Sequence, residues 1–178
     1  MKIHAGCGKV FIPGFVHVDV VDYDHIDLRH SIDSLPMIPS ESVELIFACH
    51  VLEHFHRRDA SRVLEEWHRV LKPGGVLRVA VPDFHAVALA HVEDGVPLDR
   101  LMGLLFGRQD YLYNIHATVY DQPMLERALI AAGFSEPRLY DWRKTDHAHI
   151  DDYSQAYLPH LDRENGRLMS LNMEATKP

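Results

Sequence analysis

The sequence predicts an α/β fold, because short strand-like segments alternate along the chain with segments of helical periodicity. Residues 43–49 form a nearly continuous apolar run, which is typical of a parallel strand buried on both faces. Residues 57–72 instead repeat apolar side chains at the spacing of one helical stripe. A chain of 178 residues without repeats or linker-like tracts is expected to form a single domain, residues 1–178.

The remaining elements follow from the same two patterns. The predicted strands share runs of apolar or β-branched residues bounded by turn residues: 3–5, 15–20, 25–28, 43–49, 76–81, 138–142 and 168–175. The predicted helices share wider apolar spacing: 57–72, 84–93, 98–106 and 122–132. Asp121 is placed to cap the last helix and Gly133 to end it. The stretch 107–120 has neither period, yet it holds three of the seven tyrosines.

Composition and charge exclude several classes of protein. The net charge is −8, from 18 basic and 26 acidic residues, whereas a binder of nucleic acid needs a basic face. No apolar stretch approaches the ~20 residues that span a bilayer, and the N-terminal residues do not resemble a signal peptide. Two cysteines exclude a disulfide framework. We therefore expect a cytoplasmic protein without nucleic-acid or membrane partners, and leave homodimer formation open.

A glycine turn followed by an acid indicates a nucleoside site. Gly6 and Gly8 after a strand allow backbone N–H groups to approach a ligand, and Asp19 at the next strand end can accept from ribose hydroxyls. A plain tight turn is the alternative. A dinucleotide fingerprint requires a third glycine, where this chain has Phe11, and an acid ~20 residues on, whereas Asp19 follows Gly6 by 13. The spacing disfavours a dinucleotide and leaves open a nucleoside without a pyrophosphate, such as S-adenosylmethionine.

The front half of the chain carries an ordered series of motifs: Ile3–Gly8, Pro13–Asp19, Leu35–Pro36, Ser42–Ile46, His50–Phe55 and Arg69–Gly75. In order and spacing they resemble the class I S-adenosylmethionine-dependent methyltransferases, as a small member of the type-11 kind. The resemblance implies a Rossmann-like, seven-stranded, mostly parallel sheet with the last strand antiparallel. It also implies the cofactor S-adenosyl-L-methionine at the carboxyl ends of the first, second and fourth strands. The chain starts at the first strand, so we expect it to lack the N-terminal cap helix of many members.

The resemblance also implies the cofactor-binding residues, taken over position by position. They are the glycine turn, the acid after it, a loop before the fourth strand and that strand's end: Gly6, Cys7, Gly8, Asp19, Val20, Ser31, Ile32, Asp33, Cys49 and His50. The turn would hold the methionine portion of the cofactor, and the acid and its neighbour would hold the ribose and the adenine. The loop would reach the adenine edge, and the last two residues would line the methionine and the sulfonium.

Fourteen histidines raise the question of a metal. Residues 50–54 match H-x-x-E-H, the signature of inverted zinc peptidases, which requires both histidines one turn apart on a helix. Here pattern and resemblance both place the segment where a strand opens into a loop. Zinc is therefore the disfavoured alternative, and we expect no metal site. The favoured interpretation is a hydrogen-bonded corner of Glu53 and His54 beneath the cofactor.

His116 is the candidate catalytic residue. It lies in the irregular stretch 107–120, and a neutral imidazole can take a proton from an attacking hydroxyl because its pKa lies near neutral pH. The alternative is that His116 only closes a loop. The predicted function is S-adenosylmethionine-dependent methyl transfer to a small-molecule or carbohydrate (glycan) acceptor, at oxygen. The alternatives are a non-catalytic methyltransferase-like scaffold or cofactor-binding module and, less favoured, a nicotinamide oxidoreductase.

Overall fold

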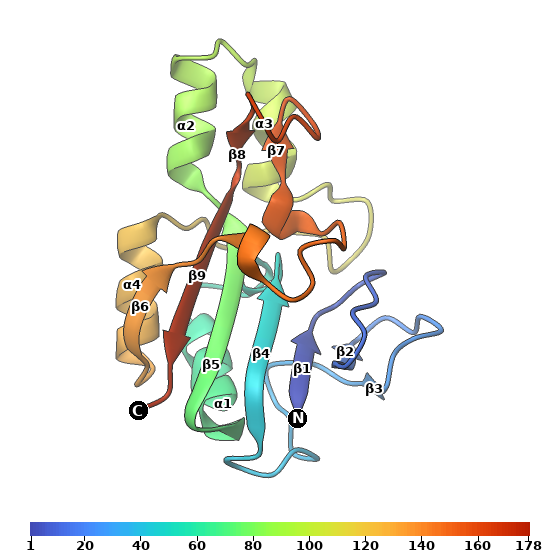
Figure 1. Ribbon diagram of the computed structural model, residues 1–178. Coiled ribbons are helices and arrows are strands. Elements are labelled where there is room, and N and C mark those ends of the chain that lie inside the picture. The colour runs from blue at the N-terminus through green and yellow to red at the C-terminus, as the bar shows by residue number, and fades with distance from the viewer.

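A seven-stranded sheet in the order β3-β2-β1-β4-β5-β9-β6 forms the centre of the molecule (Figure 1). The computed structural model describes residues 1–178. The strands of this sheet are β1 (Lys2–Ala5), β2 (Val16–Asp19), β3 (Leu28–Arg29), β4 (Val43–Cys49), β5 (Leu71–Pro82), β6 (Ser135–Leu139) and β9 (Ser170–Thr176). The α-helices are α1 (Ala60–Val70), α2 (Phe84–Val92), α3 (Leu98–Phe106) and α4 (Gln122–Ala131). The remaining elements are the 3₁₀ turns η1 (Leu52–His54), η2 (Trp142–Lys144) and η3 (Tyr153–Gln155), and the paired strands β7 (Tyr157–Leu158) and β8 (Arg167–Leu168).

The sheet is mostly parallel, as the sequence predicts. Strands β1 to β5 pair in parallel, while β9 runs antiparallel to both of its neighbours, β5 and β6. The predicted fold class is therefore confirmed. Because β2 and β4 flank β1, the strand order reverses at the β1/β4 boundary. In open α/β sheets ligands bind at such a reversal, outside the carboxyl ends of the strands. We call this side, where β1, β2 and β4 end, the carboxyl edge.

The main core lies between the sheet and two helices, α1 and α4, which stand behind the sheet in Figure 1. Alternate strand residues such as Ile3, Val18 and Ile46 point to this side and are fully buried. Helix α1 adds Val63, Leu64 and Trp67 from one stripe of its surface. The resulting cluster contains 27 buried residues, so this layer carries most of the hydrophobic stabilisation and holds the carboxyl edge rigid.

The opposite face has a different cover. The chain after β6, shown in orange, crosses in front of the sheet and supplies η2 and η3. Beneath it lies a small cluster that includes Phe47, Cys49 and Ala80. His4 and His17 face this side of the sheet next to each other, with ring centroids 5.7 Å apart, and His147 packs on Phe47 at 4.6 Å. Imidazoles thus occupy interior positions that aliphatic side chains usually fill.

Several strand boundaries differ from those predicted. The largest difference is β5, which begins at Leu71 instead of residue 76, so the helix predicted over 57–72 ends earlier, at Val70. Three other differences are local. The strand predicted over 25–28 is only Leu28–Arg29, because the Asp27 carboxylate accepts from the His17 N–H and replaces a backbone pair. The segment predicted over 138–142 begins at Ser135, with a register shift between Ser135 and Arg138. The last strand begins at Ser170, since the N–H of Met169 donates instead to Ala156 beside the β7/β8 pair.

The connections of the front half are short, and only one contains a long helix. Residues 6–15, between β1 and β2, form turns and no helix, as their length predicts. Helix α1 provides the crossover between β4 and β5. Asp121 caps α4 by accepting from the Met124 N–H, which confirms that prediction. No helix in the structure combines the length and the apolar character that a membrane span needs.

Candidate functional site

The glycine turn leaves β1 in the left-handed region, with φ of +62° at Gly6 and +54° at Gly8. A Cβ on Gly6 would lie 2.5 Å from a Val51 methyl carbon, so this glycine is required for packing as well as for backbone conformation. A Cβ on Gly8 would meet nothing within 4 Å. Gly8 therefore borders open space at the carboxyl edge, where a ligand can approach the backbone.

Asp19 ties the end of β2 to this turn. Its Oδ2 accepts from the Gly8 N–H and its Oδ1 from the Val21 N–H, each at 2.8 Å. The residue is 8% exposed, so the carboxylate is fixed in position. Each carboxylate oxygen has a further lone pair. The turn and the acid, which the sequence predicted as a pair, are thus brought together, and Val20 follows them half-buried.

The loop predicted to reach an adenine, residues 31–33, also lies near the carboxyl edge, since the His30 N–H donates to the Asp19 carbonyl. Ser31 donates from its hydroxyl to the Asp33 carboxylate. The Ile32 side chain instead packs in the main core, and its carbonyl accepts from the Trp67 indole at 2.9 Å. A ligand can therefore contact residue 32 only through its backbone.

Cys49 and His50 end β4 at the same edge. Burial raises the pKa of the Cys49 thiol, so this cysteine is not a nucleophile. His50 has a φ of +54°, and its ring Nε2 lies 3.0 Å from the Ser170 hydroxyl. Burial, with His116 and His54 nearby, lowers the pKa of His50 to about 3. The ring is therefore neutral at pH 7, positioned beside the strand reversal.

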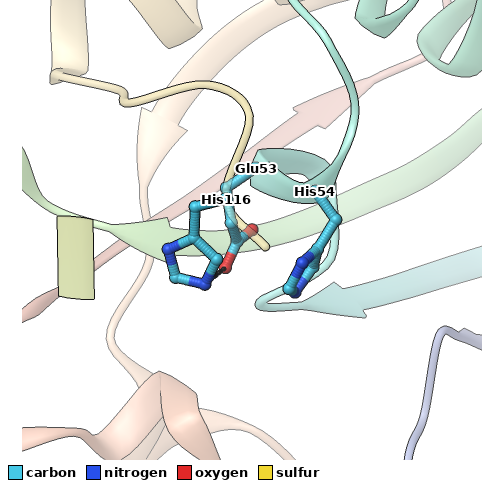
Figure 2. Close-up of side chains that lie close together, drawn as sticks. All are labelled: Glu53, His54 and His116. Atoms are coloured by element: carbon cyan, nitrogen blue, oxygen red, sulfur yellow. Dashed lines mark ion pairs between the residues drawn. The ribbon is translucent and has the colours of Figure 1, made fainter. Parts of the chain in front are cut away.

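Shortly after His50, the turn η1 carries the Glu53 carboxylate and the His54 imidazole, and the His116 imidazole from the stretch 107–120 lies beside them (Figure 2). One ligand atom from each of Glu53, His54 and His116 lies within 4.8 Å of the others. Glu53 is 1% exposed, and neither of its carboxylate oxygens has a hydrogen-bond partner. The hydrogen-bonded corner that the sequence suggested for Glu53 and His54 is therefore wrong at Glu53: its carboxylate is buried and unpaired.

His116 comes to this cluster from the irregular stretch, but its two nitrogens are already directed. Nδ1 donates to the Leu104 carbonyl at 3.0 Å, and Nε2 faces Glu53 Oε1 at 3.9 Å. Its side chain is 8% exposed, and burial lowers the pKa of His116 to about 4. To act as a general base on an acceptor, Nε2 would have to turn away from Glu53. The catalytic role of His116 stays a prediction, and the orientation of its ring does not match that of a general base.

The stretch 107–120 has no helix or strand, as predicted, and it reaches the carboxyl edge. The N–H groups of Ala117 and Thr118 donate to the Glu53 carbonyl, which fixes its C-terminal part. Its N-terminal part carries Tyr111, whose pKa is raised by burial and then by nearby Tyr23 and Asp19. The segment therefore lies between the nucleoside-type site and the Glu53 cluster.

Residues 14–79 of the chain match the family described as a methyltransferase domain. This region includes Asp19, His50, Glu53 and His54, but neither the glycine turn nor His116. No curated protein sequence matches the chain.

Solved structures extend the likeness over the whole fold. An S-adenosylmethionine-dependent methyltransferase from Thermotoga maritima superposes with a TM-score of 0.62 at 16% identity, over 99% of this chain and 82% of that one. The chain therefore has the fold of class I S-adenosylmethionine-dependent methyltransferases. The fold that the sequence motifs imply is thereby confirmed.

Two further methyltransferases show the same likeness. One is the 1,6-didemethyltoxoflavin-N1-methyltransferase of Burkholderia thailandensis, solved with its substrate and S-adenosylhomocysteine; its TM-score is 0.59 at 14% identity, over 99% of this chain and 70% of that one. The other is a Mesorhizobium loti S-adenosylmethionine-dependent methyltransferase, with a TM-score of 0.57 at 18% identity, over 98% and 89% of the two chains. At these identities the comparison establishes the methyltransferase fold and leaves the acceptor open.

Sequence reasoning missed part of this candidate site. Tyr23 and Tyr153 were not singled out, although both lie close enough to Tyr111 to raise its pKa. Glu53 and His54 were expected to form a hydrogen-bonded corner beneath the cofactor, and as metal ligands they were considered only within the zinc-peptidase pattern. The H-x-x-E-H motif was the available signal, but it gave no sign that a further histidine, His116, far along the chain, also reaches Glu53.

Proposed function

We propose that the protein is a cytoplasmic enzyme that transfers the methyl group of S-adenosylmethionine to an oxygen of a small-molecule or carbohydrate acceptor. The observation that carries the proposal is the joint geometry of the glycine turn and Asp19 at the strand reversal. In a methyltransferase fold that edge is the cofactor side. Acidic net charge argues against a nucleic-acid acceptor.

The residues present fit the cofactor. Open space above Gly8 admits a ligand against the backbone, and the fixed Asp19 carboxylate keeps lone pairs for ribose hydroxyls. His50 would line the methionine portion as a neutral ring, which avoids placing a second positive charge beside a sulfonium. When bound, S-adenosylmethionine supplies an activated methyl group on a positively charged sulfur.

The chain's own contribution is mostly alignment. Methyl transfer of this kind is an in-line displacement with a neutral leaving group, so holding the acceptor oxygen ~3 Å from the methyl supplies most of the rate. Residues 107–120 are proposed to form the rim of the acceptor pocket. Exposed tyrosines such as Tyr111 and Tyr113 offer stacking area at low entropic cost and hydroxyls that can orient a sugar or a phenol.

A thermal-shift panel with S-adenosylmethionine, S-adenosylhomocysteine and NAD tests the proposal. A ligand that binds only the folded state raises stability by RT ln(1 + [L]/Kd), or about 2.7 kcal/mol at 100 Kd. We expect the melting temperature to rise with the first two ligands and not with NAD. A rise with NAD alone would indicate the oxidoreductase alternative. Binding without methyl transfer to any phenol or glycan of an acceptor panel would favour the non-catalytic module.

A further inference from the structure

The Glu53 carboxylate is the least satisfied polar group of the carboxyl edge. It is 1% exposed, and neither oxygen accepts a hydrogen bond. Its nearest polar neighbours are His50 Nδ1 at 3.4 Å and His116 Nε2 at 3.9 Å from Oε1. A buried carboxylate without donors is costly unless it is protonated or meets a cation. No arginine or lysine forms an ion pair with Glu53, so the carboxyl is either protonated or meets a cation that the side chains around it do not supply.

The two imidazoles of the cluster, those of His54 and His116, are oriented as metal-ligating imidazoles are. In His116 the Nδ1–H donates to the Leu104 carbonyl, and in His54 the Nδ1–H donates to the Ile115 carbonyl, each at 3.0 Å. A backbone acceptor at Nδ1 fixes the neutral tautomer that carries its lone pair on Nε2. This carbonyl–histidine pattern is the usual outer support of a metal-ligating imidazole.

We propose that Glu53, His54 and His116 form a binding site for one divalent transition-metal ion such as Zn²⁺. Two imidazoles and one carboxylate suit zinc or iron better than Mg²⁺ or Ca²⁺, which prefer all-oxygen sites. Figure 2 shows the three side chains gathered from η1 and the facing stretch, with Glu53 beside the His116 ring. This inference departs from the expectation of no metal, which considered only the pair His50 and His54.

The spacing allows closure onto an ion by small side-chain movements. Ligand bonds of ~2.0–2.2 Å in a tetrahedral site place neighbouring ligand atoms about 3.4 Å apart. The 3.9 Å between His116 Nε2 and Glu53 Oε1 is about half an ångström longer than this. Three protein ligands leave a fourth position open, as catalytic zinc sites do.

The role of the ion rests on the proposed function. Bound at the open position, an acceptor hydroxyl would have its pKa lowered by the metal. The hydroxyl proton leaves to solvent, the oxygen attacks the methyl carbon, the S–C bond breaks, and its electron pair stays on sulfur as a neutral thioether. His116 then acts as a metal ligand rather than as a general base, which agrees with the direction of its two nitrogens.

Cobalt titration of the full-length, metal-free protein tests the site directly. We expect one equivalent of Co²⁺ to bind with a visible absorption band, and Zn²⁺ to displace it. Glu53→Gln and His116→Ala should each weaken binding by more than ~100-fold, because even the outer supports of a metal ligand are worth 10–100-fold. His149→Ala, an exposed histidine in a His- and Asp-rich loop, is the matched control and should leave binding unchanged.

Folding and cofactor binding are measured on the same samples. Glu53→Gln replaces an unpaired buried carboxylate with a neutral group of equal size, so circular dichroism should show it folded. Stoichiometric cobalt binding retained in folded Glu53→Gln, or no binding by the wild type, would overturn the metal site. S-adenosylhomocysteine binding without cobalt binding refutes only this inference, whereas cobalt binding without S-adenosylhomocysteine binding refutes only the proposed function.

Discussion

At the scale of single residues, Asp19 joins structure to ligand recognition. Its two oxygens hold the N–H groups of Gly8 and Val21, and their remaining lone pairs face the proposed ribose. We expect Asp19→Ala to abolish measurable S-adenosylhomocysteine binding by calorimetry, since charge-assisted bonds are worth ~1.5–3 kcal/mol each. Asp24→Ala, an exposed acid of the next loop, is the control. Equal affinities of wild type and Asp19→Ala would refute the assignment.

The two glycines of the turn should respond differently to the same change. Gly6→Ala places a Cβ 2.5 Å from a Val51 methyl carbon at a φ of +62°, so we expect stability to fall by at least ~2 kcal/mol. Gly8→Ala meets no atom within 4 Å and should cost only the ~1–2 kcal/mol of a left-handed alanine. Its methyl would enter the ligand's space, so cofactor affinity should fall more than stability. Urea unfolding and calorimetry on both variants separate the effects, and the opposite ranking would contradict this geometry.

At the scale of elements, the stretch 107–120 carries both the proposed rim of the acceptor pocket and His116, the candidate catalytic residue. Near its start, the Gln109 N–H donates to the Asn114 carbonyl and the Asn114 N–H donates to the Tyr111 carbonyl. Its end is held by the bonds that the Glu53 carbonyl accepts. A Cβ on Gly107 would lie 2.5 Å from the Asn114 carbonyl oxygen. We expect Gly107→Ala to open this loop, seen as faster hydrogen exchange at residues 109–116. Gly103→Ala is the matched control, because a Cβ there meets nothing within 4 Å. Unchanged exchange in Gly107→Ala would show that the loop closes by other contacts.

His116, from the same element, should affect turnover far more than cofactor binding. We expect His116→Ala to leave S-adenosylhomocysteine affinity nearly intact and to lower kcat by ~10²–10⁴-fold, the range for loss of acid–base or comparable help at the reacting group. The two ring nitrogens are directed to the Leu104 carbonyl and to Glu53, and neither bonds the glycine turn or Asp19. If His116 only closes the loop, stability should fall by ~1 kcal/mol with kcat almost unchanged.

At the scale of the whole molecule, the histidines beneath the orange segment predict acid sensitivity. Burial, with His17 and His147 nearby, lowers the pKa of His4 to about 3, and burial lowers that of His147 to about 4. In the unfolded chain both titrate near 6.5, so below that pH the unfolded state binds more protons and is favoured. Their contribution is complete above about pH 6.5 and is lost as pH falls toward 3–4.

Urea unfolding between pH 7 and pH 4.5 measures this effect. We expect the free energy of unfolding to fall by at least ~2 kcal/mol from His4 alone, at 1.36 kcal/mol per pKa unit. His4→Phe keeps a ring beside Phe15 and Phe47 and should flatten the profile, whereas His85→Ala, at an exposed position, should not. A profile as steep in His4→Phe as in the wild type would assign the acid sensitivity elsewhere.

Local patterns in the sequence are sufficient to predict most of the individual strands and helices and half of the candidate site, whereas the arrangement of the seven strands came from the family resemblance. Local signals carry these features: the buried run of β4, the apolar stripe of α1, the cap at Asp121, and a glycine turn followed by an acid. Such features depend on residues close together in the chain, so periodicity and turn chemistry reveal them.

Only the tertiary structure shows that His116, far along the chain, lies beside Glu53 together with His50 and His54. Carbonyls of Leu104 in α3 and Ile115 in the aperiodic stretch 107–120 orient the rings of His116 and His54. The tertiary structure also decided that Ile32 faces the core and that Tyr111 lies close enough to Tyr23, Asp19 and Tyr153 for them to raise its pKa. Contacts between distant segments are set by how strands and loops pack, and no local pattern encodes them.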